Sequence, residues 1–300
     1  MAKKTFVFFF AILFSISLFA AQETARMGVV TKSVENLHRA ASDETDVVSQ
    51  AIIGTNVKIL KSGKNAKGEE WFQIETPDTY QGWMISTSLR IYKEGEKLYA
   101  SEENVFEVQS LIAFIYKEDD VTEHKPLTMA PISALLEVGS CGERWCDVTL
   151  PAGDKGWIQV GDGVVRDAQM KRKRLSPPET VAIAKRFLGL PYLWGGNTPL
   201  GIDCSGFVQL IYRLSGIEIL RDADIQMLKS GLVEVPPGEE KMGDLVFFGK
   251  SREKISHVGM MLNEKEFINA TTHLRPIVQI SELSEPYWKN IYQGARRPKE

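Results

Sequence analysis

Cys204 is the residue with the clearest chemical potential in this sequence, because it lies where a polar turn passes into a helical pattern. After Gly201-Ile202-Asp203-Cys204-Ser205-Gly206, apolar residues recur at i, i+3, i+4 and i+7, which predicts a helix; they are Phe207, Leu210, Ile211 and Leu214. Asp203 is a favourable N-cap, so Cys204 falls in the first helical turn. The unpaired backbone N–H groups and the helix dipole there are expected to lower the pKa of the thiol and make it reactive. The alternative is a small buried side chain, as free cysteine often is.

A thiolate nucleophile needs a base, and His257 is a candidate because it opens an apolar strand pattern, His257-Val258-Gly259-Met260-Met261. An imidazole without a partner is costly in such a strand, so the alternative is a hydrogen-bonded histidine of the core. Residues 263–265 predict a three-residue hairpin loop, which places His257 opposite Thr271. Asn269 and His273 are then both diagonal neighbours of His257, about 7 Å away, and this pattern leaves the two equal. A two-residue loop would put Asn269 on the opposite face.

Composition and charge place the chain among ordinary folded proteins. The 300 residues are 43% hydrophobic and 25% charged, with a formal net charge of −3. These values exclude a disordered chain and offer no bulk basic charge for nucleic acid. A chain of this length suggests about two domains, or more if the domains are small. We therefore expect no nucleic-acid partner, and we expect a monomer.

The N-terminus predicts a signal peptide over residues 1–21. Lys3 and Lys4 precede an apolar run from Phe6 to Ala21, which ends in the small residues that a signal peptidase prefers. The run is short for a membrane span, and polar sequence follows it directly. We expect cleavage there, no stable membrane span afterwards, and export to the periplasm or the extracellular space. No cysteine lies near this point, which argues against a lipid-anchored form.

The chain has three cysteines, too few for a disulfide scaffold. Cys141 and Cys146 bracket Gly142-Glu143-Arg144-Trp145, which predicts a hairpin that a local disulfide would close. Two unpaired strand residues are the alternative, and the pattern leaves both open. In either case Cys204 remains an odd thiol in an exported protein, which marks it as reactive.

Two stretches that precede the Cys204 region predict small β-barrels. Residues 27–92 contain short strand patterns separated by Gly, Asn, Asp and Lys turns: Val29-Val30, Val47 to Ile53, Val57 to Leu60, Trp71 to Ile74 and Trp83 to Ile85. Residues 105–165 repeat the theme, since Trp71 and Gly82-Trp83 are echoed by Trp145 and Gly156-Trp157. Residues 93–104 form a charged connector between them. The paired motifs resemble those of bacterial SH3-like (SH3b) domains, in two copies.

Residues 166–178 predict a linker, and residues 179–300 predict a third domain. The linker contains Lys171-Arg172-Lys173-Arg174, for which contact with anionic cell-wall polymer is the alternative to a solvated segment. Ser176-Pro177-Pro178-Glu179 predicts a helix start with a capping box. Strand patterns follow the Cys204 helix, namely Asp244 to Phe248, His257 to Leu262 and Glu266 to Ala270. The predicted class is α+β, with a helix-borne thiol facing an antiparallel sheet that carries a histidine.

The third domain resembles the NlpC/P60 cysteine peptidases, because motifs of that family occur in the family's order: Tyr192-Leu193-Trp194-Gly195-Gly196, Asp203-Cys204-Ser205-Gly206, Arg221-Asp222-Ala223, Gly243-Asp244-Leu245-Val246-Phe247-Phe248 and His257-Val258-Gly259. The resemblance implies a papain-like core with Cys204 as nucleophile and His257 as base. The third polar residue of the family follows a Phe-Ile pair, which selects Asn269 over His273. Tyr192 matches a tyrosine whose hydroxyl lies near the nucleophile and assists the oxyanion; a packed aromatic is the alternative. No cofactor and no metal is implied, and no metal-ligand spacing occurs.

The two SH3b-like stretches before such a domain resemble a subgroup that cleaves murein peptides between γ-D-glutamate and L-lysine or meso-diaminopimelate. In that subgroup the peptide has a free N-terminal L-alanine. Arg221-Asp222 matches the Arg-Asp-Ser motif, in which Asp222 would help bind the alanine ammonium; Ala223 replaces the serine, which leaves only backbone groups there. Tyr80, in a Tyr-x-Gly-Trp segment, would reach the same amine from the first SH3b domain.

Three further residues are candidate substrate contacts. Asp46 corresponds, more weakly than Tyr80, to an acidic residue of the amine pocket, while Asp203 and Ser205 flank the nucleophile. The resemblance thus implies a dipeptidyl-peptidase that acts on free peptidoglycan-derived peptides. One alternative is a D,L-endopeptidase or amidase on intact peptidoglycan, with the SH3b pair in contact with the cell wall. The other is a non-catalytic wall-binding protein, against which the complete set of Cys204, His257 and Asn269 argues.

Overall fold

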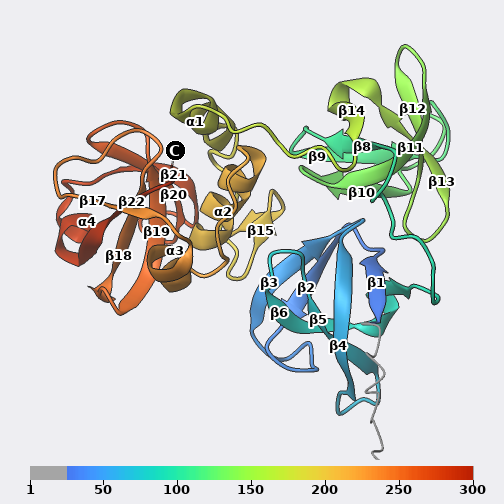
Figure 1. The fold of residues 1–300 in the computed structure, drawn as a ribbon, viewed down its shortest axis with the longest axis horizontal. Helices are drawn as coiled ribbons and strands as arrows, with labels where there is room; N and C mark the ends of the chain where they lie inside the picture. Colours follow the sequence, from blue (N-terminus) through green and yellow to red (C-terminus); the bar gives the residue numbers. More distant parts are fainter. Residues whose placement is uncertain (1–25, 300) are drawn as a thin grey trace, which may run out of the picture.

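A computed structural model of the chain describes residues 26–299, so the predicted signal peptide lies outside the described residues. Two β-sheet domains precede a C-terminal α+β domain (Figure 1), which confirms the predicted fold class. All three parts line a cavity of about 660 Å³ where they meet. In the part of the chain that the structure describes, no helix is long and apolar enough to cross a membrane.

The first β domain is a seven-stranded sheet in the order β3-β2-β6-β5-β4-β1-β7. Phe72 and Ile74 alternate along β5 and point into a core that also contains Leu37 and Val57. A short 3₁₀ helix, Ser86–Ser88, precedes the last strand. The strands are β1 (Met27–Val30), β2 (Val34–His38), β3 (Val47–Ile52), β4 (Asn56–Lys64), β5 (Glu70–Glu75), β6 (Gln81–Ile85) and β7 (Leu89–Ile91).

The second β domain repeats this architecture, with the strand order β10-β9-β13-β12-β11-β8-β14. The register repeats as well, because Gln73 pairs with Trp83 in the first domain and Asp147 pairs with Trp157 in the second. The predicted internal repeat is therefore confirmed. The strands are β8 (Asn104–Val108), β9 (Ile112–Tyr116), β10 (Thr128–Pro131), β11 (Leu135–Cys141), β12 (Trp145–Thr149), β13 (Lys155–Gln159) and β14 (Gly163–Asp167).

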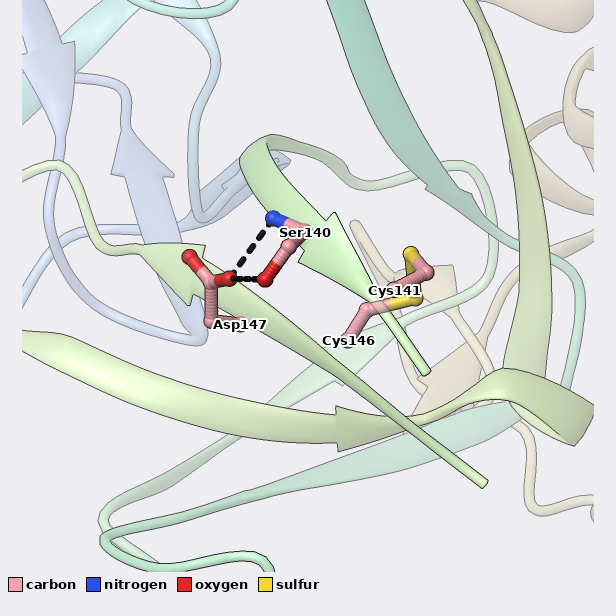
Figure 2. Close-up of a disulfide and its surroundings, with 4 residues drawn as sticks. All are labelled: Ser140, Cys141, Cys146 and Asp147. Carbon is pink, nitrogen blue, oxygen red and sulfur yellow. Dashed lines mark hydrogen bonds between the residues drawn. A yellow bond between two sulfur atoms is a disulfide. The ribbon is translucent and has the colours of Figure 1, made fainter. Parts of the chain in front are cut away.

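A disulfide between Cys141 and Cys146 closes the β11–β12 hairpin (Figure 2), which decides between the two alternatives left open by the sequence. Next to it, the backbone N–H and the hydroxyl of Ser140 both donate to Asp147 Oδ2, each at 2.6 Å. The disulfide and this carboxylate therefore hold the same hairpin.

The connector between the β domains is more than a charged segment. Its Tyr99 is only 3% exposed and belongs to an apolar cluster with Val29, Tyr92 and Val105. The Tyr99 hydroxyl donates to the carbonyl of Thr149 at 2.5 Å. This aromatic residue therefore fixes the two β domains to each other.

The α+β domain is built on a six-stranded sheet in the order β17-β22-β18-β19-β20-β21, with a separate pair formed by β15 and β16. Ser176 caps the first helix, where its N–H donates to Glu179 Oε2 at 2.7 Å, as the capping box predicts. The elements are α1 (Pro177–Lys185), β15 (Asn197–Thr198), β16 (Gly201–Ile202), α2 (Cys204–Leu214), α3 (Ala223–Lys229), β17 (Val233–Val235), β18 (Leu245–Ser251), β19 (Lys254–Met261), β20 (Glu266–Thr271), β21 (Ile277–Glu282), α4 (Pro286–Ile291) and β22 (Tyr292–Arg297).

Helix α2 packs on the sheet at β19 and β20. Phe207 and Ile211 of the helix share one buried cluster with Val258 and Ile268 of these strands. Met260 pairs with Ile268, which is the register that the three-residue loop predicts. The helix and the strand pair thus bring the nucleophile candidate and the histidine candidate to the same edge of the core.

In the basic linker Lys171, Lys173 and Arg174 are exposed, as expected for a solvated segment, whereas Arg172 is packed. Arg172 donates to Glu107 Oε1 at 2.8 Å, and the Glu107 side chain is only 8% exposed. The N–H of Leu175 donates to the carbonyl of Ser215 at the end of α2. Arg172 therefore balances a buried carboxylate of the second β domain, a partner that no local sequence pattern reveals.

Candidate active site

Cys204 begins α2, where the sequence predicts it. The Asp203 side chain caps the helix, since Oδ1 accepts from the N–H of Gly206 at 2.7 Å. Cys204 is 6% exposed, and the backbone N–H groups of Val258 on β19 and of Ser205 act to lower the pKa of its thiol. Burial, with the Asp203 carboxylate as the second contribution, raises the pKa of Cys204 to about 12. The expected lowering of this pKa is therefore wrong for the free protein, because burial outweighs the helix-end effect.

His257 is held by Asn269, whose Oδ1 lies 2.9 Å from the imidazole Nε2. Asn269 is fully buried, and its Nδ2 donates to the Gln279 carbonyl at 3.3 Å and to Ser281 Oγ at 3.2 Å. These two contacts assign the amide, so that its oxygen faces the histidine and accepts from Nε2–H. The remaining nitrogen, Nδ1, is then the one that can accept a proton.

Asn269 rather than His273 is the residue that the structure brings to His257. His273 turns instead to Glu285, with Nε2 at 2.8 Å from Oε1, and stacks on Tyr287 with ring centroids 3.9 Å apart. The family resemblance thus selected the residue that the strand pattern alone left undecided.

Buried Cys204 and half-buried His257 are both neutral in the resting protein. Burial lowers the pKa of His257 to about 4, although the Asn269 hydrogen bond and the Asp203 carboxylate act in the opposite direction. With the pKa of Cys204 raised and that of His257 lowered, the site holds a thiol and an unprotonated imidazole at neutral pH. Such a pair works by general-base catalysis, in which the proton leaves sulfur as the sulfur attacks.

Tyr192 is close enough to Cys204 for the two groups to interact electrostatically, and its backbone N–H donates to the carbonyl of Pro276 at 2.8 Å. Burial and the Cys204 sulfur both raise the pKa of the Tyr192 hydroxyl. The hydroxyl therefore stays protonated at neutral pH and can donate a hydrogen bond to a developing oxyanion.

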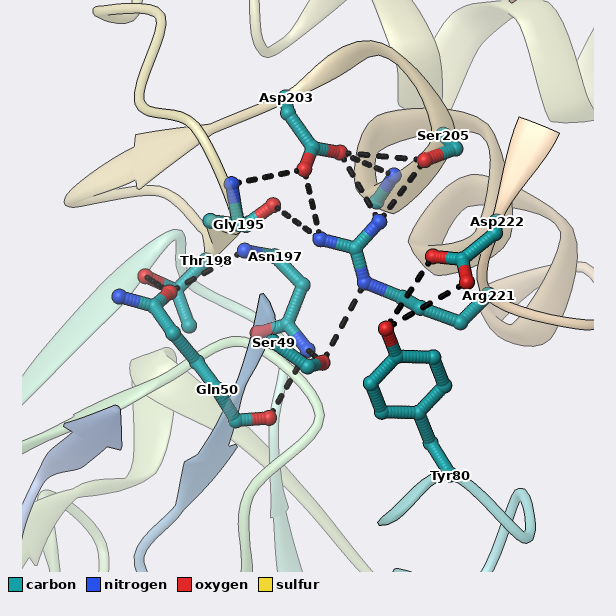
Figure 3. A network of polar contacts seen from close by, with 12 residues as sticks. Ser49, Gln50, Tyr80, Gly195, Asn197, Thr198, Asp203, Ser205, Arg221 and Asp222 are labelled. Carbon is teal, nitrogen blue, oxygen red and sulfur yellow. Dashed lines mark hydrogen bonds and ion pairs between the residues drawn. The ribbon is translucent and has the colours of Figure 1, made fainter. Parts of the chain in front are cut away.

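Tyr80 and Asp222 meet across a domain boundary, although they are 142 residues apart in sequence. The Tyr80 hydroxyl lies 3.3 Å from Oδ1 and 3.4 Å from Oδ2 of Asp222 (Figure 3). Burial raises the pKa of Tyr80 to about 12, with a contribution from the Asp222 carboxylate, and burial also raises the pKa of Asp222 against the effect of Arg221. Ala223, the next residue, begins α3 and is buried.

Arg221 lies at the centre of the site. The sequence did not predict it as a site residue, because it was noted there only as the neighbour of Asp222. It is 3% exposed and forms a two-pronged ion pair with Asp203, at 3.0 Å from Nη1 to Oδ1 and 2.7 Å from Nη2 to Oδ2 (Figure 3). Nη1 also donates to Ser205 Oγ at 2.8 Å, and Nε donates to Ser49 Oγ of β3 at 3.3 Å. This one guanidinium joins the first β domain to the start of the nucleophile helix.

Asp203 and Ser205, expected to contact substrate, are therefore occupied by this network. Asp203 Oδ2 accepts an additional hydrogen bond from the N–H of Gly195 at 2.9 Å. Their contact with substrate stays a prediction, and the structure adds a positioning role for both. Asp46 lies at the surface before β3, where it pairs with Arg39 at 3.3 Å.

Gln50 of β3 provides a second link that the sequence did not indicate. Its side-chain oxygen accepts from the N–H of Asn197 at 3.1 Å and from Thr198 Oγ1 at 3.4 Å, and its carbonyl accepts from Asn197 Nδ2 at 3.0 Å. The first β domain thus holds the loop before Cys204. Among residues 26–299, no three His, Cys, Asp or Glu side chains gather as a metal site.

Comparison with known proteins agrees with this geometry. The model of the NlpC/P60 family matches residues 189–297. A γ-D-glutamyl-L-lysine dipeptidyl-peptidase of Bacillus cereus is 30% identical over 262 residues, which cover 83% of this chain and 74% of that protein. The chain belongs to the NlpC/P60 family. It is accordingly a cysteine peptidase, as the motifs predict.

Two further similarities extend over most of this NlpC/P60 peptidase. A second γ-D-glutamyl-L-lysine dipeptidyl-peptidase, from Bacillus subtilis, is 28% identical over 87% of this chain and 86% of its own. The crystal structure of an NlpC/P60 family protein from Bacillus cereus superposes with a TM-score of 0.77 at 25% identity, covering 90% of this chain and 99% of that one. The likeness therefore includes the β domains as well as the peptidase domain.

Proposed function

We propose that this peptidase hydrolyses the bond between γ-D-glutamate and an L-diamino acid in peptidoglycan-derived peptides that have a free N-terminal L-alanine. The observation that carries the proposal is the contact of Tyr80 with Asp222, made across a domain boundary beside the nucleophile helix. The bond named by the two Bacillus dipeptidyl-peptidases supports the choice of substrate. Export through residues 1–21 is part of the same proposal.

The chemistry follows from the neutral pair. Cys204 attacks the amide carbonyl while His257 Nδ1 takes its proton, and the Tyr192 hydroxyl donates to the oxygen that becomes negative. The imidazolium, still held by Asn269 through Nε2–H, then gives its proton to the leaving amine. Water activated by His257 releases the acyl group from sulfur and restores the thiol.

Selection for a free amine follows from charge. A substrate ammonium placed between Asp222 and Tyr80 gives the half-buried carboxylate a cationic partner, and such charge-assisted hydrogen bonds are among the stronger ones. An N-acylated stem has no positive charge there, so it would cover Asp222 without supplying a cationic partner. A pocket that depends on this pairing rejects the analogue that lacks it.

The test compares hydrolysis of L-Ala-γ-D-Glu-L-Lys with that of its N-acetyl form. We expect cleavage of the free peptide and a large loss for the acetylated one, and equal rates would overturn the free-amine pocket. Cys204→Ala and Cys204→Ser are expected to fold and to lose turnover, which removes a thiol-independent background. Release of soluble fragments from purified sacculi at a comparable rate would favour an endopeptidase on intact wall instead.

A further inference from the structure

One face of the His257 ring is covered by an aromatic side chain from the far end of the chain. Trp288, in the short helix α4, stacks on the imidazole with ring centroids 4.9 Å apart and an interplanar angle of 25°. Trp288 itself is only 1% exposed. The motifs that identify the nucleophile and the base contain no signal for this residue, since it follows Asn269 by a whole strand and a turn.

The Trp288 ring is immobilised from several sides. Phe248 lies 4.9 Å away between centroids, Phe267 5.3 Å, Tyr287 4.8 Å and His273 5.4 Å, the last three in edge-to-face geometry. A ring packed in this way cannot swing away from His257 without disturbing the cluster. The stack is therefore a fixed wall for the imidazole.

The indole nitrogen of Trp288 shows that a tryptophan at this position has an energetic cost. Its Nε1 is buried and has no hydrogen-bond partner within residues 26–299. A buried donor without a partner costs about 1–3 kcal/mol, which phenylalanine at this position would avoid. The protein therefore has an indole at this position although its N–H is unpaired. The feature that the larger ring adds is its contact with the face of the His257 imidazole.

We propose that Trp288 is a positioning residue for the peptidase reaction: its ring holds the His257 imidazole in the plane that keeps Nε2 on Asn269 and leaves Nδ1 for Cys204. The imidazole rotates about a soft terminal torsion, so one hydrogen bond at Nε2 leaves the ring free to tilt, and a stacked wall removes that freedom. The same stack keeps water off that face of the partly exposed ring. This proposal rests on the proposed catalytic role of His257.

The other groups that face His257 do not supply this restraint. Asn269 of β20 bonds one nitrogen, Phe248 of β18 lies at 5.8 Å and tilted by 43°, and Asp203 is the charged group that acts on the ring. Beyond Trp288, the titratable pair His273–Glu285 lies behind the indole edge. The flat contact over the imidazole therefore comes from Trp288.

The test uses alkylation of Cys204 by iodoacetamide as a function of pH, because this readout needs no peptide substrate. The other two cysteines of the chain are joined in a disulfide, so the reaction reports on Cys204. In the wild-type protein we expect the rate to hold down to about pH 4, where His257 becomes protonated. In Trp288→Leu the ring meets water, and its pKa returns toward the ordinary value of about 6.5. At pH 5.5 this variant should then react about tenfold more slowly than at its own plateau.

Phe267→Leu is the matched control, because Phe267 belongs to the same aromatic cluster and touches Trp288. It removes a ring of the core while leaving Trp288 over the imidazole, so the wild-type pH profile should remain. A Trp288→Leu protein that folds and keeps the wild-type profile overturns the proposal. An equal shift in Phe267→Leu also overturns it, since the effect would then be general loosening of the core.

Two further measurements keep the proposal testable if Trp288→Leu does not fold. Trp288→Phe keeps a ring over His257 and removes the unpaired N–H, so we expect a folded protein with a nearly unchanged profile. In the wild-type protein, ¹⁵N spectra of the imidazole should show a single tautomer protonated at Nε2, and a mixture of tautomers overturns the proposal.

With L-Ala-γ-D-Glu-L-Lys as substrate, a folded Trp288→Leu protein should lose about 10²-fold in kcat with KM unchanged. If the wild-type protein does not cleave this peptide, the proposed function fails while the alkylation profiles still decide the role of Trp288.

Discussion

The two β domains share one strand order and one register, yet only the first sends side chains into the active site. Measured from the pairing partners in the neighbouring strands, Ser49 and Gln50 of β3 correspond to Thr128 and Met129 of β10. In the first domain these positions bind Arg221 and the loop before Cys204. In the second domain the same positions hold a threonine and an apolar side chain.

The turn between the fifth and sixth strands of each domain shows the same contrast. In each turn a residue at positive φ, Thr79 or Gly153, precedes the residue of interest. Tyr80 follows in the first domain and contacts Asp222, whereas its counterpart Asp154 is exposed. The backbone is alike in both, since the carbonyls of Tyr80 and Asp154 accept the equivalent hydrogen bond at 3.0 Å and 2.8 Å. One side chain on a common turn therefore decides which domain contributes to specificity.

The second domain touches the peptidase domain mainly as a support. Ile132 packs into the core cluster that contains the nucleophile helix. Arg186 donates to the Gln109 carbonyl at 2.7 Å, and Arg213 donates to Ser133 Oγ at 3.3 Å. The two copies of one β fold therefore have different roles. The first contributes side chains to the active site, and the second packs against the peptidase domain.

The largest effect that separates the two domains is expected from Tyr80→Phe. This change removes the hydroxyl from Asp222, and a hydrogen bond to a charged group is worth about 1.5–3 kcal/mol. We expect kcat/KM for L-Ala-γ-D-Glu-L-Lys to fall by about 10- to 10²-fold. Asp154→Asn, at the equivalent position, should leave it unchanged. Similar losses in both variants would contradict the division of roles.

The pH dependence of the same two variants should separate the domains further. Burial raises the pKa of Asp222, so its carboxylate is protonated at a higher pH than an ordinary carboxyl group. Binding of the free amine should therefore be lost as pH falls, starting above the usual titration range of an aspartate. The Tyr80 hydrogen bond lowers this pKa, so Tyr80→Phe should move the acid limb of kcat/KM to higher pH. In Asp154→Asn the limb should stay in place, and an alkaline limb near pH 8 from the substrate amine should appear in every variant. If the acid limb has the same pKa in Tyr80→Phe as in the wild-type protein, the expected effect of the Tyr80 hydroxyl on Asp222 is contradicted.

A smaller effect is expected at the paired positions of β3 and β10. Gln50→Ala leaves the N–H of Asn197 and the buried hydroxyl of Thr198 without their acceptor, which costs about 1–3 kcal/mol of folding free energy. Because that loop leads to Cys204, we expect a severalfold loss of kcat together with the loss of stability. Met129→Ala should reduce stability through packing alone. Denaturant unfolding and initial rates on both variants measure the two effects separately.

The parts of the site that were predictable from sequence depend on short-range order or family motifs. The N-cap at Asp203 and the register of the strand that carries His257 follow from local patterns, and both are observed, the register at Met260 and Met261. The repeat was visible because Trp and Gly-Trp recur at equal spacing. Strand β2 was missed because polar residues interrupt its alternation, and β7 because it has three residues.

The parts that were not predictable arise from contacts between distant segments. Arg221 pairs with Asp203 across 18 residues and with Ser49 across 172, and no periodicity connects such positions. The pKa of Cys204 was predicted in the wrong direction because the helix end is a local feature, while burial depends on the whole fold. The stack of Trp288 on His257 is likewise a product of sheet order, which brings α4 back to β19.

The smallest effect on activity is expected from the hairpin of the second domain, where a disulfide closes a short loop (Figure 2). In the first domain the equivalent hairpin is held by the Asn65 side chain, which accepts from the N–H groups of Lys67 and Glu69. Replacing the disulfide by Cys141→Ser with Cys146→Ala should cost about 2 kcal/mol, the value expected for a loop this small.

Because this hairpin belongs to the supporting domain, kcat/KM should stay within twofold of the wild-type value, and Asn65→Ala provides the matched change in the first domain. Thermal unfolding and peptide hydrolysis of the two variants make the comparison. If the disulfide variant folds but loses activity to the extent expected for Tyr80→Phe, the second domain must position the active site as well, and the contrast between the two copies would no longer hold.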